Sequence, residues 1–392
     1  MNTDEGIGSQ SDMSSVICGS TRSSSVAVED SEASSASEVL HDCQVHGHQL
    51  LYLNYKGLTK FPAQLLQENA YQHIKGIYLK RNLLQTLPTN LKTLTNLKEL
   101  YLPSNKIIDL PDDMSELTQL ESLDLSMNSL QHIPSCVFGI KSLKSLILSQ
   151  NSIAHLSSEI GKMRALMTLV LNHNLLTSLP SEIQHCSSLE TLNLDKNFLK
   201  VLPRQITLLH RLEELSVTGN KLVYLPMDLG YCPSLQKVYA DNNPYLKAIP
   251  FSLWSKTVGT YSCGTETICD SGLYAEFKEA NMSAYIPHEI QSIRSKNSSP
   301  VSTLLEISYR YVNKQQGILK IESLPRSVRE QAVTATAHCE FHGCSRQLFT
   351  GCYPHLLKHP ITTLQQPNST TFIGLCCSLK CLDLFSRFPL PL

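Results

Sequence analysis

The stretch LESLDLSMNSLQHIP, residues 120–134, decides the fold of this chain of 392 residues. It places leucines two or three positions apart before an asparagine, and the same frame returns in LEELSVTGNKLVYLP, residues 212–226. Asparagines recur every 23 residues, at Asn82, Asn105, Asn128, Asn151, Asn174, Asn197, Asn220 and Asn243. Because self-similarity at a fixed period is the signature of a repeat architecture, the sequence predicts a solenoid.

Each repeat has a simple physical reading. Leu123 and Leu125 flank one outward residue, which is the alternation of a short strand, and they are expected to stack on equivalent leucines of the neighbouring repeats. Each asparagine is expected to turn inward and bond backbone groups of the turns. The half after Leu-Pro has apolar residues at helix-like intervals, which favours short helices or irregular turns on the outer wall. We therefore expect an α/β leucine-rich repeat solenoid of about nine 23-residue repeats over residues 46–262, with a parallel concave sheet.

The ends of the predicted solenoid are atypical. In LLYLNYKGLTKFP, residues 50–62, Lys56 stands where asparagine belongs, and the step to Asn82 is 26 residues, which indicates a capping repeat with a three-residue insertion. In NNPYLKAIPFSLW, residues 242–254, Tyr245 and Trp254 are expected to close the rear of the core. Cys186 and Cys232 share the register of Met163, and we interpret them as core residues.

Composition limits the class of protein. Hydrophobic residues make up 42% and charged residues 17% of the chain, as in ordinary globular proteins. Residues 1–42 contain twelve serines and eight acids against one base, so residues 1–45 are expected to be a disordered Ser-rich acidic tail. The positive surplus on the rest is too thin for nucleic-acid binding, and a signal peptide or membrane span is not predicted. We expect a cytoplasmic or nuclear protein.

The predicted concave face combines aromatic, aliphatic and charged residues, as interface hot spots do. The candidate protein-binding residues are Tyr78, Lys80, Arg81, Tyr101, Asp124, Ile147, Val170, Asn193, Asp195, Glu214, Tyr239 and Asp241. The alternative is a polar surface that only keeps the stack soluble. No phosphate-binding loop or nucleophile motif is found, which favours a non-enzymatic protein–protein interaction module.

Two further segments are predicted after the solenoid and a linker at 263–300. In TLLEISYRYV, residues 303–312, the apolar positions form one helical stripe, which favours a helix within a segment at 301–335. The stripe alone favours a core helix. With Leu324-Pro325 downstream, an adaptor-binding helix is equally consistent with the sequence.

The 301–335 segment resembles a suppressor-of-cytokine-signalling box. The matching residues are Thr303, Leu304, Ser308 and Val312 in the helix, followed by Leu324 and Pro325. Ser308 stands where cysteine is commonest, and Arg326 stands where the pattern repeats an aliphatic residue. The resemblance implies binding to Elongin B and C with a cullin, and hence a substrate receptor of a ubiquitin ligase. The alternative is a signalling scaffold without any ligase link.

Residues 336–385 are predicted to be a Cys/His module within a small, mainly helical C-terminal region. HCEFHGC and CCSLKC offer Cys339, Cys344, Cys377 and Cys381 as ligands for structural zinc, and buried free thiols are the alternative. With LYLNYKGLTKFP, VYADNNPYLKAIP and SLPRS, these motifs resemble the leucine-rich repeat protein family from about residue 48 to 385. That resemblance implies an interaction protein.

Overall fold

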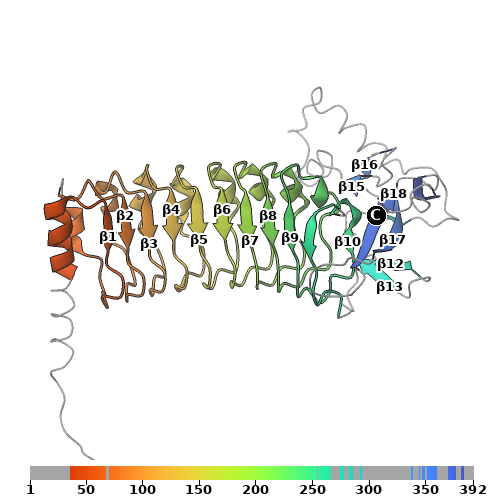
Figure 1. Ribbon diagram of the computed structural model, residues 1–392, viewed down its shortest axis with the longest axis horizontal. Coiled ribbons are helices and arrows are strands. Elements are labelled where there is room, and N and C mark those ends of the chain that lie inside the picture. Colours follow the sequence, from red (N-terminus) through yellow and green to blue (C-terminus); the bar gives the residue numbers. More distant parts are fainter. Residues whose placement is uncertain are drawn as a thin grey trace, which may run out of the picture.

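The computed structural model describes residues 36–67, 70–253 and 255–265, and shorter segments at 274–277, 282–285, 292–293, 337–338, 344, 347–348, 351–359, 370–376 and 381–383. Its main body is a solenoid whose strands lie side by side in chain order (Figure 1). The parallel sheet contains β1 (Leu50–Tyr52), β2 (Gly76–Tyr78), β3 (Glu99–Tyr101), β4 (Ser122–Asp124), β5 (Ser145–Ile147), β6 (Thr168–Val170), β7 (Thr191–Asn193), β8 (Glu214–Ser216), β9 (Lys237–Tyr239) and β11 (Thr257–Gly259).

The register of the sheet confirms the predicted repeat. Leu123 lies opposite Leu146, which lies opposite Leu169, so each strand is shifted by one 23-residue repeat. At the front, Leu51 lies opposite Ile77, and the 26-residue step is absorbed between the strands without disturbing the ladder. These five side chains are at most 1% exposed, so one continuous apolar core runs along the stack.

The wall opposite the sheet is built of short 3₁₀ helices, which confirms the predicted short helical turns. They are η1 (Ala63–Leu66), η2 (Leu91–Thr93), η3 (Asp112–Glu116), η4 (Ser135–Gly139), η5 (Ser158–Lys162), η6 (Ser181–His185), η7 (Arg204–Leu208), η8 (Leu229–Tyr231) and η9 (Phe251–Leu253). Several follow the proline of the Leu-Pro step, as η3 follows Pro111 at φ −69°. Proline fixes φ and has no backbone N–H. Because an N–H at the start of a helix has no acceptor within the helix, proline suits this position.

The predicted asparagine ladder is present. The Nδ2 of Asn174 donates to the backbone oxygens of Leu148 and Leu171 at 2.9 and 3.0 Å, and its Oδ1 accepts from the N–H of Ile153 at 3.0 Å. At the front, Asn82 bonds the backbone N–H of Lys56, so the capping repeat joins the ladder through its main chain. Buried backbone groups of the turns are thereby satisfied.

The front of the solenoid is closed by a helix over residues 36–46, which corrects the prediction of a disordered tail for residues 36–45. Ala36, Leu40 and Cys43 are at most 5% exposed and belong to the solenoid core. They fall at i, i+4 and i+7, one face of a helix. The composition of this segment did not reveal the short apolar stripe, because serines and acids surround it. Residues 1–35 lie outside the described part of the chain.

The described C-terminal residues form strands, which corrects two predictions. The expected linker at 263–300 contains β12 (Tyr274–Phe277), β13 (Met282–Tyr285) and β14 (Ser292–Ile293), with β12 and β13 paired as a hairpin. The expected mainly helical region contains β15 (Ala337–His338), β16 (Gln347–Leu348), β17 (Gly351–His359) and β18 (Thr370–Cys376). Within the described segments of this region, only residues 381–383 are helical.

The C-terminal strands close the rear of the solenoid. A second sheet runs in the order β10 (Ile249–Pro250), β18, β17 and β14, so that Ile249 pairs with Phe372 (Figure 1). Ile373 and Leu375 are 1% exposed. Tyr245, expected to close this end, is partly buried, and Trp254 lies outside the described residues. No helix in the described segments is long and apolar enough to cross a membrane.

A polar contact also ties this region to the repeats. The backbone N–H of His338 donates to Oδ1 of Asp228 at 2.8 Å, and its ring Nδ1 lies 2.9 Å from Oδ2 of the same carboxylate. Asp228 immediately precedes η8, and Tyr231 within η8 meets the His338 ring edge-on. The solenoid end and the C-terminal strands therefore form one packed body.

Candidate functional site

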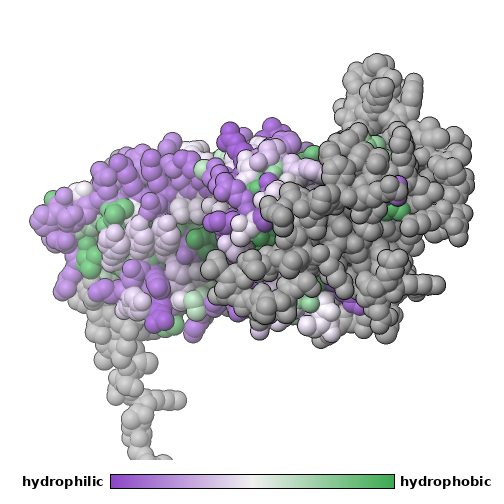
Figure 2. Space-filling model, turned by 45° about the vertical axis from the view of Figure 1, so that its right-hand side comes forward, coloured by the Kyte–Doolittle hydropathy of each residue, from purple (hydrophilic) through white to green (hydrophobic). Residues whose placement is uncertain are grey.

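The solvent-facing side of the parallel sheet, which we call the sheet face, carries the predicted binding residues. In each repeat the residue between the two buried strand positions lies on this face, as Tyr78 lies between Ile77 and Leu79. Lys80 and Arg81 are exposed, and ten of the predicted residues are partly exposed: Tyr78, Tyr101, Asp124, Ile147, Val170, Asn193, Asp195, Glu214, Tyr239 and Asp241. Among the coloured residues of Figure 2, hydrophilic side chains predominate and hydrophobic ones form small separate areas.

Three tyrosines from successive strands stack at the front of the sheet face. The ring centroids of Tyr52 and Tyr78 lie 4.7 Å apart, and those of Tyr78 and Tyr101 lie 4.9 Å apart at an interplanar angle of 4°. Both spacings match the separation of neighbouring strands, so the register of β1 to β3 itself produces the stack. Tyr52 at the open end is 54% exposed. The sequence interpretation missed Tyr52, although its L-Y-L context places it in the register of Tyr78.

Hydrogen bonds hold these rings in place. The Tyr78 hydroxyl donates to the carboxylate of Glu99, and the Ser122 hydroxyl donates to the Tyr101 hydroxyl oxygen at 3.1 Å. Burial and, to a smaller extent, the hydrogen bond to Glu99 raise the pKa of Tyr78 well above its ordinary value, so the phenol stays protonated. Tyrosines fixed in this way offer a large contact area and lose little conformational entropy when a partner binds.

Basic and apolar side chains border the stack. The guanidinium of Arg81 lies 5.6 Å from the ring centre of Tyr55, within the range of a cation–π contact. Tyr55 is 60% exposed and Leu50 is 43% exposed. We call this group the front patch, and its members are Leu50, Tyr52, Tyr55, Tyr78, Lys80, Arg81 and Tyr101.

The acids at the rear of the sheet face are engaged within the protein. Oδ1 of Asp195 accepts from the Ser216 hydroxyl at 2.6 Å and from the backbone N–H of Thr218 at 2.7 Å. Oδ1 of Asp241 accepts from the backbone N–H of Tyr261 at 2.6 Å. Such bonds fix the turns after the strands. The rear acids therefore have a structural task that the sequence pattern did not indicate.

Four other predicted face residues also have structural neighbours. Asp124 accepts from the backbone N–H of Ser126 at 2.8 Å, and Glu214 lies 3.6 Å from Lys237. Ile147 and Val170 lie directly opposite each other on β5 and β6. Ile147 and Val170 form a small apolar patch in the middle of the sheet face.

The remaining predicted site residues fall largely outside the described part of the chain. This applies to Thr303, Leu304, Ser308, Val312, Leu324 and Pro325, and to Cys339 and Cys377. Of the other two predicted zinc ligands, Cys344 is partly buried and Cys381 is 8% exposed. Neither the adaptor box nor the cysteine zinc site is therefore tested by the geometry.

Comparison with known proteins identifies the repeats. Residues 95–153, 141–199 and 164–222 match the family model described as leucine rich repeat. A leucine-rich repeat protein of Leptospira interrogans is 24% identical over 54% of this chain and 72% of its own, with a TM-score of 0.41. Internalin C2 of Listeria monocytogenes is 21% identical over 48% of this chain and 84% of its own, with a TM-score of 0.42. The family matches, the parallel sheet and the repeated turns together establish a leucine-rich repeat solenoid.

Proposed function

We propose that this leucine-rich repeat protein is a non-enzymatic interaction module that holds a protein partner on its sheet face, with the front patch as the anchor. The observation that carries this proposal is the stack of Tyr52, Tyr78 and Tyr101, which is ordered internally and open to solvent at Tyr52. Ordered aromatic residues beside a cationic group are the side chains that dominate binding energy in protein interfaces.

The front patch also indicates the chemistry of the partner. Lys80 and Arg81 are exposed beside the tyrosines, whereas the acids of the rear are bonded to their own turns. A partner segment with an apolar or aromatic residue next to acidic ones would complement this arrangement, because opposite charges at an interface give specificity and speed association.

The test compares partners captured by the full chain with those captured by a Tyr52→Ala/Lys80→Glu variant. Proximity labelling in cells identifies the partner, and binding to the purified partner is then measured. We expect a loss of about 30-fold or more in affinity, since truncating one interface tyrosine commonly costs about 2 kcal/mol. Lys141→Glu is the matched control, because Lys141 is an exposed lysine beyond η4 on the opposite wall. Equal binding by the double variant and the control would refute the front patch as the anchor.

A finer proposal is that the protein is a substrate receptor of a cullin-type ubiquitin ligase, working in the cytoplasm or nucleus. It rests on the sequence pattern of Thr303, Leu304, Ser308 and Val312 followed by Leu324-Pro325. In this proposal the repeats hold the substrate, and the apolar stripe of the box docks as a helix in a groove of the Elongin B and C adaptor. The wider order of motifs resembles leucine-rich repeat-containing protein 28. This resemblance implies an interaction protein and does not itself specify a ligase.

Co-purification decides between this proposal and a scaffold without a ligase. Elongin B and C should accompany the parent chain and be lost from a Leu304→Asp variant, while the partner of the front patch is retained by both. Failure of the parent chain to bring down the two Elongins would favour the scaffold.

Structural zinc on Cys339, Cys344, Cys377 and Cys381 is a separate proposal, checked by the zinc content of a variant with all four changed to serine.

A further inference from the structure

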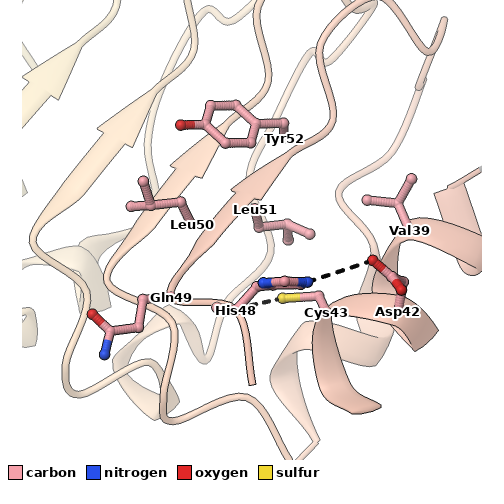
Figure 3. Close-up of a pocket in the computed structure, with 8 residues that line it drawn as sticks. All are labelled: Val39, Asp42, Cys43, His48, Gln49, Leu50, Leu51 and Tyr52. Atoms are coloured by element: carbon pink, nitrogen blue, oxygen red, sulfur yellow. Dashed lines mark hydrogen bonds and ion pairs between the residues drawn. The ribbon is translucent and has the colours of Figure 1, made fainter. Parts of the chain in front are cut away.

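Three metal-ligating side chains gather where the helix over residues 36–46 meets the first strand. Nδ1 of His46 lies 2.9 Å from one carboxylate oxygen of Asp42, and Nε2 of His48 lies 3.7 Å from the other. One ligand atom from each of the three residues lies within 4.8 Å of the others. The close-up in Figure 3 shows His48 directed at Asp42. Two imidazoles therefore converge on one carboxylate.

The backbone around the cluster is arranged by the end of the helix. Gly47 has φ +64°, a left-handed conformation that glycine adopts readily, and it reverses the chain so that the N–H of His48 donates to the Cys43 oxygen at 3.1 Å. This is the bond of a Schellman helix terminus. The Cys43 thiol in turn donates to the His48 oxygen at 3.2 Å (Figure 3). His48 is therefore fixed beside the last turn of the helix by its main chain.

We propose that Asp42, His46 and His48 form a binding site for a divalent transition metal, with zinc as the expected ion. Imidazole nitrogen and carboxylate oxygen are zinc ligands, and bonds of about 2.1 Å in a tetrahedral site place the ligand atoms roughly 3.4 Å apart. The observed separations need small side-chain rotations, and Nδ1 of His46 must give up its 3.1 Å contact with the Asp42 backbone oxygen. Exposed residues permit both changes, and the three side chains are 56–62% exposed. A cation here is also favoured by the partial negative charge at the helix C-terminus.

Three protein ligands leave one coordination position open, and the site adjoins the front patch. Asp42 and His48 line a pocket of about 420 Å³ together with Leu50 and Tyr52, two members of that patch (Figure 3). Cys43 faces the core at 2% exposure and takes no part in the ligand set. Bound zinc would connect the helix to the chain entering β1 and leave its open position available to a carboxylate or imidazole of a bound partner.

The experiment titrates chelator-treated, reduced full-length protein with zinc and measures the number of equivalents bound by calorimetry. A His46→Gln/His48→Gln variant should bind one equivalent fewer than the parent. The matched control is His132→Gln/His155→Gln, two exposed histidines of the repeats that should leave the count unchanged. A variant with Cys339, Cys344, Cys377 and Cys381 changed to serine should retain this equivalent, which separates the site from the cysteines.

Hydrogen exchange supplies a localised second measurement. With zinc at about 100 times its Kd, amides of residues 36–48 that exchange by opening of this helix should slow by up to about 100-fold in the parent but not in the double variant. Gly47→Ala, which strains the left-handed turn, should weaken zinc binding while leaving all three ligands in the sequence. Equal zinc stoichiometry in the parent and the His46→Gln/His48→Gln variant, or zinc protection that persists in that variant, would overturn the proposal.

Discussion

Replacing one asparagine of the ladder tests the account of how the repeats are held together. In Asn174→Ala, the buried carbonyls of Leu148 and Leu171 each lose one of their two asparagine donors, and the buried N–H of Ile153 loses its side-chain acceptor. Asn174 is 3% exposed, so water does not readily replace these bonds. At about 1 kcal/mol for each net hydrogen bond, the loss is about 3 kcal/mol, and an orphaned N–H can add to it. We expect the free energy of unfolding to fall by roughly 3 kcal/mol.

The measurement is urea denaturation followed by far-UV circular dichroism, with the change read from the midpoint at constant m. Because a repeat array can open in parts, exchange of the Ile153 amide is followed as well. The matched control is Asn96→Ala, which removes an exposed asparagine that donates to the Gln72 oxygen at 2.9 Å. This control should lower the free energy of unfolding by less than about 0.5 kcal/mol. Equal destabilisation by both variants would refute the view that the buried ladder, and not asparagine in general, stabilises the turns.

Three further predictions concern the rear of the solenoid and its core. In Gly230→Ala the new Cβ would collide with the backbone carbonyl of Ser252, so η8 and η9 must separate, and thermal unfolding should show a loss of about 1–3 kcal/mol. The bond to Asp228 raises the pKa of His338, so this contact stabilises the protein fully below the ordinary histidine pKa and loses its contribution as pH rises through the raised value. Asp228→Asn should therefore flatten the dependence of the melting temperature on pH across this window. Burial raises the pKa of Cys186 to about 12, so alkylation of native protein at about pH 8 should leave this thiol unmodified.

Each of these predictions has its own contrary outcome. A Gly230→Ala protein as stable as the parent would show that η8 and η9 are not in tight contact. A melting temperature that keeps the same pH dependence in Asp228→Asn would show that His338 does not titrate against this carboxylate. Rapid alkylation of Cys186 in the native protein, identified by peptide mass, would contradict its place in the core.

The front patch shows how much of a candidate binding site the local sequence pattern can predict. The 23-residue period places Tyr78 and Tyr101 on one face, because strand alternation and repeat stacking are both local rules. Tyr52 follows the same rule, but the atypical capping repeat concealed it. That Asp195 and Asp241 serve their own turns depends on bond geometry, which residue type alone does not reveal.

The sequence by itself determined the solenoid, its register and the asparagine ladder, since each repeat contacts only its neighbours and a short period is enough to specify those contacts. Only the tertiary structure decided what closes the two ends. The helix over residues 36–46 covers the front, and β18 pairs with Ile249 and Pro250 at the rear. These contacts are non-periodic, and the second joins strands far apart in the chain. The cluster of Asp42, His46 and His48 depends on the same closure, because it forms where the capping helix ends and the first strand begins.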